Sequence, residues 1–253
     1  MTEAFETEGG SAENHELDGD GLPRPRWGLG DVVITLVGDL VLGLAISSIV
    51  LGLVHGPLDS PSGRAWASIL LLVVPWIALA GWPIFVARHR GNGPVRDYGL
   101  RLTWRDAGVG LGGGMAALVL ASIVGAIEIK IIGHDFSAAV EDVAKQTTAA
   151  SHAALWVLAL CAAVGAPIVE ELAFRGLTYG ALRKIGLPVV YSVVWSSAIF
   201  ALFHFEFVRL PVLLVIGGCL GTVRAYTGST SASMMSHMVV NIPGAIGILA
   251  LAR

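Results

Sequence analysis

The sequence predicts an all-α fold, a polytopic bundle of about seven membrane-spanning helices. Hydrophobic residues make up 55% of the chain and charged residues 14%, with a mean hydropathy of +0.73. Soluble domains are about half apolar and a quarter charged. The apolar residues come in blocks of about 20, the length with which a helix crosses about 30 Å of hydrocarbon. We therefore expect membrane lipids, and no nucleic acid, among the partners.

Composition divides the chain into three parts. Residues 1–26 are acidic and rich in Gly and Pro, which predicts a disordered tail. Residues 27–150 hold three spanning helices and a polar loop at 133–152 that is expected outside the bilayer, with a short amphipathic helix as one form it could take. Residues 151–253 hold the remaining helices. The apolar blocks are 32–54, 65–87, 107–132, 153–183, 188–206, 209–226 and 231–251.

Basic residues are distributed unequally between the two sets of loops. Loops on the side of the N-terminus hold Arg24, Arg26, Arg88, Arg90, Arg96, Arg101, Arg105, Arg183, Lys184 and Arg224. Those on the opposite side hold Arg64, Lys130, Lys145, Arg209 and Arg253. Because loops rich in Lys and Arg stay in the cytoplasm, this asymmetry predicts a cytoplasmic N-terminus.

Two pairs of glycines have the spacing of close helix packing. Gly110 with Gly114, and Gly217 with Gly221, follow the small-xxx-small pattern that lets helix backbones approach in lipid. The glycine run at 108–114 has neither the preceding strand nor the following Lys of a phosphate-binding loop. We interpret these glycines as packing residues.

Three ionisable residues lie within one apolar block. Each costs roughly 2.5–3.5 kcal/mol near the centre of a spanning helix unless it is paired or faces a cavity. Glu171 and Arg175 are four residues apart in the order that favours an ion pair, which leaves Glu170 as the unpaired carboxylate. Glu170 is therefore a candidate general base for a water molecule. The alternative is that all three residues form a packing network between helices.

The next motifs place two histidines on neighbouring helices. Phe200 and His204 share one helical face, as do His237 and Asn241. On antiparallel helices Glu170 and His204 can meet at one depth, and His237 can reach the same cavity. Single membrane histidines also serve as interhelical hydrogen-bond donors. Together, however, a carboxylate, two imidazoles and an amide could activate water and stabilise an oxyanion, as amide hydrolysis requires.

Two other hydrolytic chemistries have less support in the sequence. No Ser has a matching His and Asp, and the HExxH motif of zinc proteases is absent. We expect no metal cofactor, with a zinc ion held by Glu170, His204 and His237 as the alternative.

The three motifs resemble those of the CPBP family of intramembrane proteases. This family includes CAAX prenyl endopeptidases of the Rce1 type and Abi proteins, which act in bacteriocin processing and immunity. The resemblance covers about residues 150–250 and depends on the order of the motifs on three membrane helices. The matching residues are Glu170-Glu171-x-x-x-Arg175, Phe200-x-x-x-His204 and His237-x-x-x-Asn241.

The resemblance implies a glutamate-dependent endopeptidase in a bacterial cell membrane, acting on a peptide or a membrane-associated or prenylated-type protein. It implies that Glu170 and His204 activate water and that His237 and Asn241 stabilise the oxyanion. Glu171, Arg175 and Phe200 would support them.

Two other classes of function remain open from the sequence. A proton-coupled transporter would use Glu170 and the histidines as a relay, and a non-catalytic scaffold or immunity protein would keep the motifs for folding.

Among the other membrane acids, Asp39 and Glu128 are expected to face helix partners or an interface. Glu206 is expected at the membrane boundary, with a substrate contact as the alternative.

Overall fold

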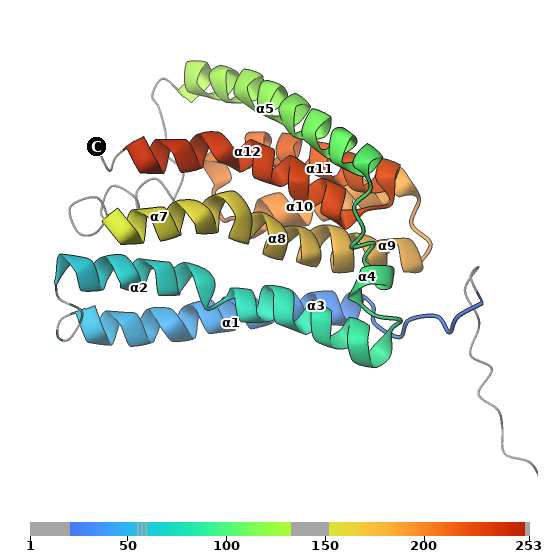
Figure 1. Cartoon of the computed structure of the whole chain (residues 1–253), viewed down its shortest axis with the longest axis horizontal. Helices are drawn as coiled ribbons and strands as arrows, with labels where there is room; N and C mark the ends of the chain where they lie inside the picture. The colour runs from blue at the N-terminus through green and yellow to red at the C-terminus, as the bar shows by residue number, and fades with distance from the viewer. Residues whose placement is uncertain (1–20, 55, 57, 59, 133–151, 251–253) are drawn as a thin grey trace, which may run out of the picture.

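The chain folds as a helical bundle in a computed structural model that describes residues 21–54, 56, 58, 60–132 and 152–250 (Figure 1). The predicted all-α class is confirmed. The expectations for residues 1–20 and for the polar stretch at 133–151 lie outside the described residues. The helices are α1 (Leu29–Val54), α2 (Pro61–Val73), α3 (Trp76–Arg90), α4 (Pro94–Asp97), α5 (Trp104–Ile132), α7 (His152–Leu160), α8 (Ala166–Glu171), α9 (Tyr179–Lys184), α10 (Val189–Phe203), α11 (Leu210–Thr227) and α12 (Thr230–Ala250).

Six helices of the described part are long and apolar enough to cross a membrane. They are Leu29–Leu53, Ser62–Arg90, Trp104–Ile132, His152–Lys184, Phe207–Thr227 and Thr230–Ala250. The remaining apolar block, predicted at 188–206, forms α10, which has 15 residues and ends at Phe203 rather than near 206. Its rise of about 22 Å is less than the roughly 30 Å of hydrocarbon. The chain is therefore a multi-pass membrane bundle in which one helix is too short to span.

The long helix that runs from α7 to α9 lies in the middle of the bundle. Figure 1 shows α1, α2 and α3 on one side of it and α5 and α12 on the other. Helix α5 packs against α11 and α12, and α10 packs against α11. Large apolar side chains face outward on the outer helices, for example Leu44, 70% exposed, and Val190, 70% exposed. Such an outer surface requires lipid rather than water.

Charged and aromatic residues tie several helices together at one end of the bundle. Arg90 of α3 forms an ion pair with Asp31 of α1. The indole nitrogen of Trp27 donates to Asp97 of α4 at 2.7 Å, and Lys184 at the end of α9 lies 4.3 Å from the centre of the Trp27 ring. Many of the basic loop residues that predict a cytoplasmic N-terminus lie at this end of the bundle. Its location in the cytoplasm stays a prediction.

The predicted glycine contacts are confirmed between α5 and α12. A Cβ atom on Gly114 would lie 2.7 Å from both the carbonyl oxygen of Ser236 and the Cβ of Val239. One on Gly110 would lie 2.7 Å from the carbonyl oxygen of Ala232. The two backbones therefore approach too closely for any side chain at these positions, which holds α12 and its polar residues against α5.

Replacing Gly114 with Ala is expected to destabilise the bundle by about 1–3 kcal/mol, because the added methyl group meets backbone atoms. Gly112→Ala is the matched control, since a Cβ at Gly112 has no atom within 4 Å. That control should be neutral or slightly stabilising, because Ala favours helix more than Gly. Denaturant titration of the purified variants in detergent measures both. Equal stability of the two variants would contradict the close packing.

Candidate active site

The helix that carries the two glutamates is interrupted by two π-helical segments. Residues Cys161–Gly165 precede α8 and residues Leu172–Thr178 follow it. In the first segment, the N–H of Ala166 bonds to the carbonyl of Cys161, five residues back. The next N–H in this pattern would come from Pro167, which has none. The carbonyl of Ala162 is therefore left for another donor, and the Asn241 amide nitrogen donates to it at 2.8 Å.

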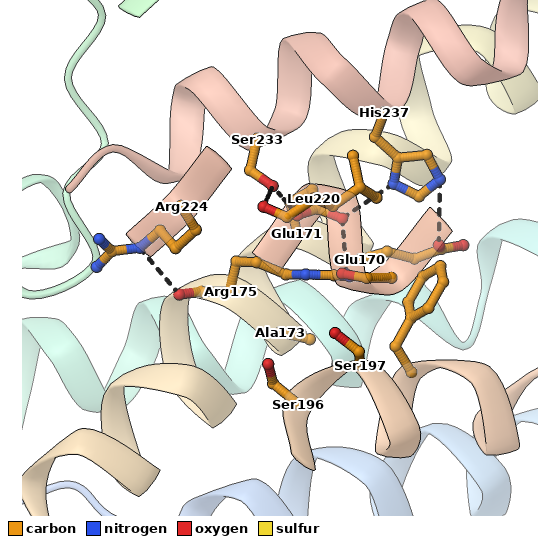
Figure 2. Close-up of polar contacts among 12 residues, drawn as sticks. Glu170, Glu171, Ala173, Arg175, Ser196, Ser197, Leu220, Arg224, Ser233 and His237 are labelled. Atoms are coloured by element: carbon orange, nitrogen blue, oxygen red, sulfur yellow. Dashed lines mark hydrogen bonds and ion pairs between the residues drawn. The ribbon is translucent and has the colours of Figure 1, made fainter. Parts of the chain in front are cut away.

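Glu171 and Arg175 form an ion pair that is completely buried. The Arg175 Nη1 to Glu171 Oε1 distance is 2.9 Å, and both side chains have 0% exposure. Arg175 also donates through Nη2 to the carbonyl of Gly217 on α11 at 2.9 Å. The predicted pairing is thus present, and Figure 2 shows it at the centre of a polar network. The carboxylate and guanidinium each stay charged because they have partners.

Two residues of α12 complete the hydrogen bonding of Glu171. Ser233 donates its hydroxyl to Oε2 at 2.5 Å, and His237 Nδ1 lies 3.0 Å from Oε1 (Figure 2). An ionised carboxylate only accepts hydrogen bonds, so the proton of this contact lies on His237 Nδ1. Glu171 therefore orients the imidazole of His237 and fixes which of its nitrogens carries this proton.

Glu170 faces both histidines in the structure. Its Oε2 lies 3.9 Å from His237 Nε2 and 3.9 Å from His204 Nε2. His204 Nδ1 lies 2.8 Å from the carbonyl oxygen of Phe200, which can only accept, so this nitrogen carries the proton. In neutral His204 the Nε2 lone pair then points to the side of Glu170. Both separations exceed a direct hydrogen bond and match those that a bridging water spans.

The Phe200 ring fills the space between these groups. Its centre is 4.5 Å from that of His204, 5.8 Å from that of His237 and 4.5 Å from Arg175 Cζ. Phe200 itself is 1% exposed. A rigid ring packed on a guanidinium and two imidazoles restricts their orientations and excludes water from the ion pair.

A cavity of about 550 Å³ opens onto these residues. Among the residues that line it are the four predicted catalytic positions Glu170, His204, His237 and Asn241. Most of the remaining lining is apolar and comes from α5, α11 and α12. Within the described residues, no group of three or more His, Cys, Asp and Glu side chains is found that could hold a metal ion. The absence of a metal cofactor, with zinc at Glu170, His204 and His237 as the alternative, stays a prediction.

The structure also adds residues that the sequence interpretation did not include. Ser233 precedes His237 by one helical turn, and this i, i+4 spacing on one face could have identified it. The roles of the Ala162 and Gly217 carbonyls depend on contacts between distant helices and have no sequence signal.

Glu128, one of the other membrane acids named from the sequence, is buried on α5, and neither of its carboxylate oxygens is hydrogen-bonded.

The described geometry is that of a membrane-embedded site in which a carboxylate faces two imidazoles. Residues 152–243 match the family model described as Type II CAAX prenyl endopeptidase Rce1-like. The match agrees with the resemblance of the three motifs to the CPBP family of intramembrane proteases, and the matched region contains all seven motif residues. No curated protein and no solved structure matches the chain.

Removing the cation of the buried pair should cost more than removing both charges. Arg175→Met leaves Glu171 buried with fewer donors, and we expect a loss of about 3–5 kcal/mol in unfolding free energy. In the double variant Glu171→Gln/Arg175→Met, no charge is left unpaired, so part of this loss should be recovered. Denaturant titration in detergent measures the cycle. A double variant no more stable than the single one would argue against the ion pair as the stabilising element.

Proposed function

We propose that the chain is an intramembrane endopeptidase that hydrolyses peptide bonds with a water molecule activated by Glu170. The observation that carries this proposal is the position of Glu170 Oε2 at 3.9 Å from both imidazole Nε2 atoms, beside a largely apolar cavity. The match to the Rce1-like family model supports a protease at the level of the family. A carboxylate and an imidazole that share one water molecule provide a general base and its orienting partner.

In the proposed first step, Glu170 takes a proton from the water while the oxygen attacks the carbonyl carbon of the scissile bond. His204 accepts the second hydrogen bond of the water through its free Nε2, because its Nδ1 is occupied by the Phe200 carbonyl. This pair fixes the direction of attack. Glu170 then returns the proton to the leaving amine as the carbon–nitrogen bond breaks.

The negative charge on the carbonyl oxygen needs donors in the same cavity. In the proposed step His237 acts as an imidazolium that donates its Nε2–H to this oxygen, while Glu171 holds its Nδ1–H. The Asn241 amide carries two hydrogens, and its bond to the Ala162 carbonyl leaves one for the oxyanion. Donors of this kind, held in place before the reaction, typically contribute about 2.7–4 kcal/mol each.

The proposed substrates are membrane-associated or prenylated-type proteins. The matched family is described by its action on CAAX prenyl substrates, in which a lipidated Cys lies near the C-terminus. The apolar lining contributed by residues such as Leu118, Leu213 and Ile216 is compatible with a lipid chain beside the peptide.

Glu170→Gln should abolish cleavage of a fluorogenic prenylated peptide while the protein stays folded. We expect a drop of at least about 100-fold, because general bases typically contribute 10²–10⁴-fold. Glu128→Gln is the matched control, a buried membrane carboxylate on α5 that does not line the cavity. Cleavage is measured with purified protein in detergent, and folding by its unfolding midpoint. Undiminished cleavage by Glu170→Gln would exclude Glu170 as the general base, whereas no cleavage by the unaltered protein would favour a role for the motifs in folding or transport.

Incubation with a metal chelator should leave cleavage unchanged within about twofold, because the proposed base and oxyanion donors are side chains of the protein. The assay compares chelated protein with the same protein to which zinc is added back. Loss of activity that zinc restores would replace the glutamate mechanism with a metal-bound water.

A further inference from the structure

A second pair of charges lies in the cavity of the proposed active site. Glu206 and Arg209 both line this cavity and form an ion pair, with 2.6 Å between Arg209 Nη1 and Glu206 Oε2. Their side chains are 22% and 25% exposed, respectively. They lie on the turn between α10 and α11, directly after His204. This pair has no role in the hydrolysis described above.

The turn that carries the pair follows a short helix, because α10 rises only about 22 Å. Glu206 and Arg209 of this turn line a cavity inside an apolar bundle. Charged residues inside a membrane bundle mark functional positions. Phe205, between His204 and Glu206, has a φ of 55°, a strained conformation for a bulky residue. Strain of this kind persists only where the surrounding structure enforces it.

Arg209 has donors beyond those that bind Glu206. A guanidinium carries five N–H groups in a fixed fork, and a quarter of this side chain is exposed. The bond to Glu206 uses Nη1, and a guanidinium fork binds carboxylates in a bidentate manner. Arg209 also directly precedes the N-terminus of α11, where the helix dipole adds to the positive potential. These features point to an anion with two coplanar oxygens.

We propose that Arg209 binds a carboxylate of the substrate and that Glu206 holds the guanidinium in position for it. The proposal rests on the proposed function, because a peptide bound across Glu170 can place its carboxylate at Arg209 within the same cavity. The carboxylate comes from the C-terminus of the peptide or from an acidic side chain. The enzyme thereby selects substrates in which a carboxylate lies close to the scissile bond.

Binding to the Glu170→Gln protein tests this selection without a need for cleavage. Three fluorescent apolar peptides are compared in detergent: a free acid, its C-terminal amide, and an amide whose last residue is Glu. The free acid should bind about tenfold more tightly than its amide. Tight binding of the Glu-containing amide as well would assign the site to any carboxylate, and weak binding would assign it to the terminal one.

Variants of the pair should change this preference to different extents. Arg209→Gln should remove it, so that free acid and amide bind equally. Glu206→Gln should reduce it without removing it, because Arg209 keeps its charge but loses the carboxylate that holds the guanidinium. Arg105→Gln, a change at an exposed arginine outside the cavity, is the control and should bind like the parent. A turn that served only as scaffold would instead lose binding of all three peptides in both variants.

Failure of this proposal can be distinguished from failure of the proposed function. Equal binding or no binding of the three peptides overturns the carboxylate site, even if cleavage depends on Glu170. Equal loss for all three peptides in both Arg209→Gln and Glu206→Gln overturns it too. If the peptides bind with the expected preference but Glu170→Gln still cleaves, the carboxylate site stands and the mechanism fails.

Discussion

The buried ion pair between Glu171 and Arg175 is the interaction on which the rest of the site depends. With no water available, these two charges need partners from the protein, and α11 and α12 supply them through the Gly217 carbonyl, Ser233 and His237. The requirement for hydrogen bonds therefore sets how far α11 and α12 can slide or rotate along the central helix. Glu170, the next residue around that helix, is left to face the cavity because its neighbour takes all of these donors.

The central helix reaches this geometry by departing from ideal α-helical form. A proline on the first turn of α8 and the π-helical residues around it leave carbonyl groups without an intrahelical donor, as π segments at functional sites often do. Asn241 bonds to one of these carbonyls, so the amide is held on the cavity wall by the irregularity itself. The two π-helical segments have different roles. The first provides the Ala162 carbonyl that accepts a hydrogen bond from α12, and the second carries Arg175 toward α11.

The short helix α10 determines where the bundle is hollow. It stops after Phe203, so His204 is at the end of the helix, with its ring held by the Phe200 carbonyl and the Phe200 ring. The chain then turns back into α11. The same turn brings Glu206 and Arg209 into the cavity, so the proposed catalytic residues and a separate charged pair share one largely apolar chamber.

The sequence by itself determined the membrane class and the positions of the apolar helices. It also determined the Glu171–Arg175 pairing and the identity of the motif residues. Hydrophobic blocks and i, i+4 spacings are local properties, so both can be recognised along the chain. The sequence also placed Glu170 and His204 at one depth, since both lie a similar helix length from the link between their helices. Only the tertiary structure decided that His237 bridges the two glutamates, that Asn241 bonds to Ala162, and that α10 ends early enough to bring Arg209 into the cavity. These contacts join residues on different helices, and their geometry depends on helix rotation and on π-helical distortions that no local pattern specifies.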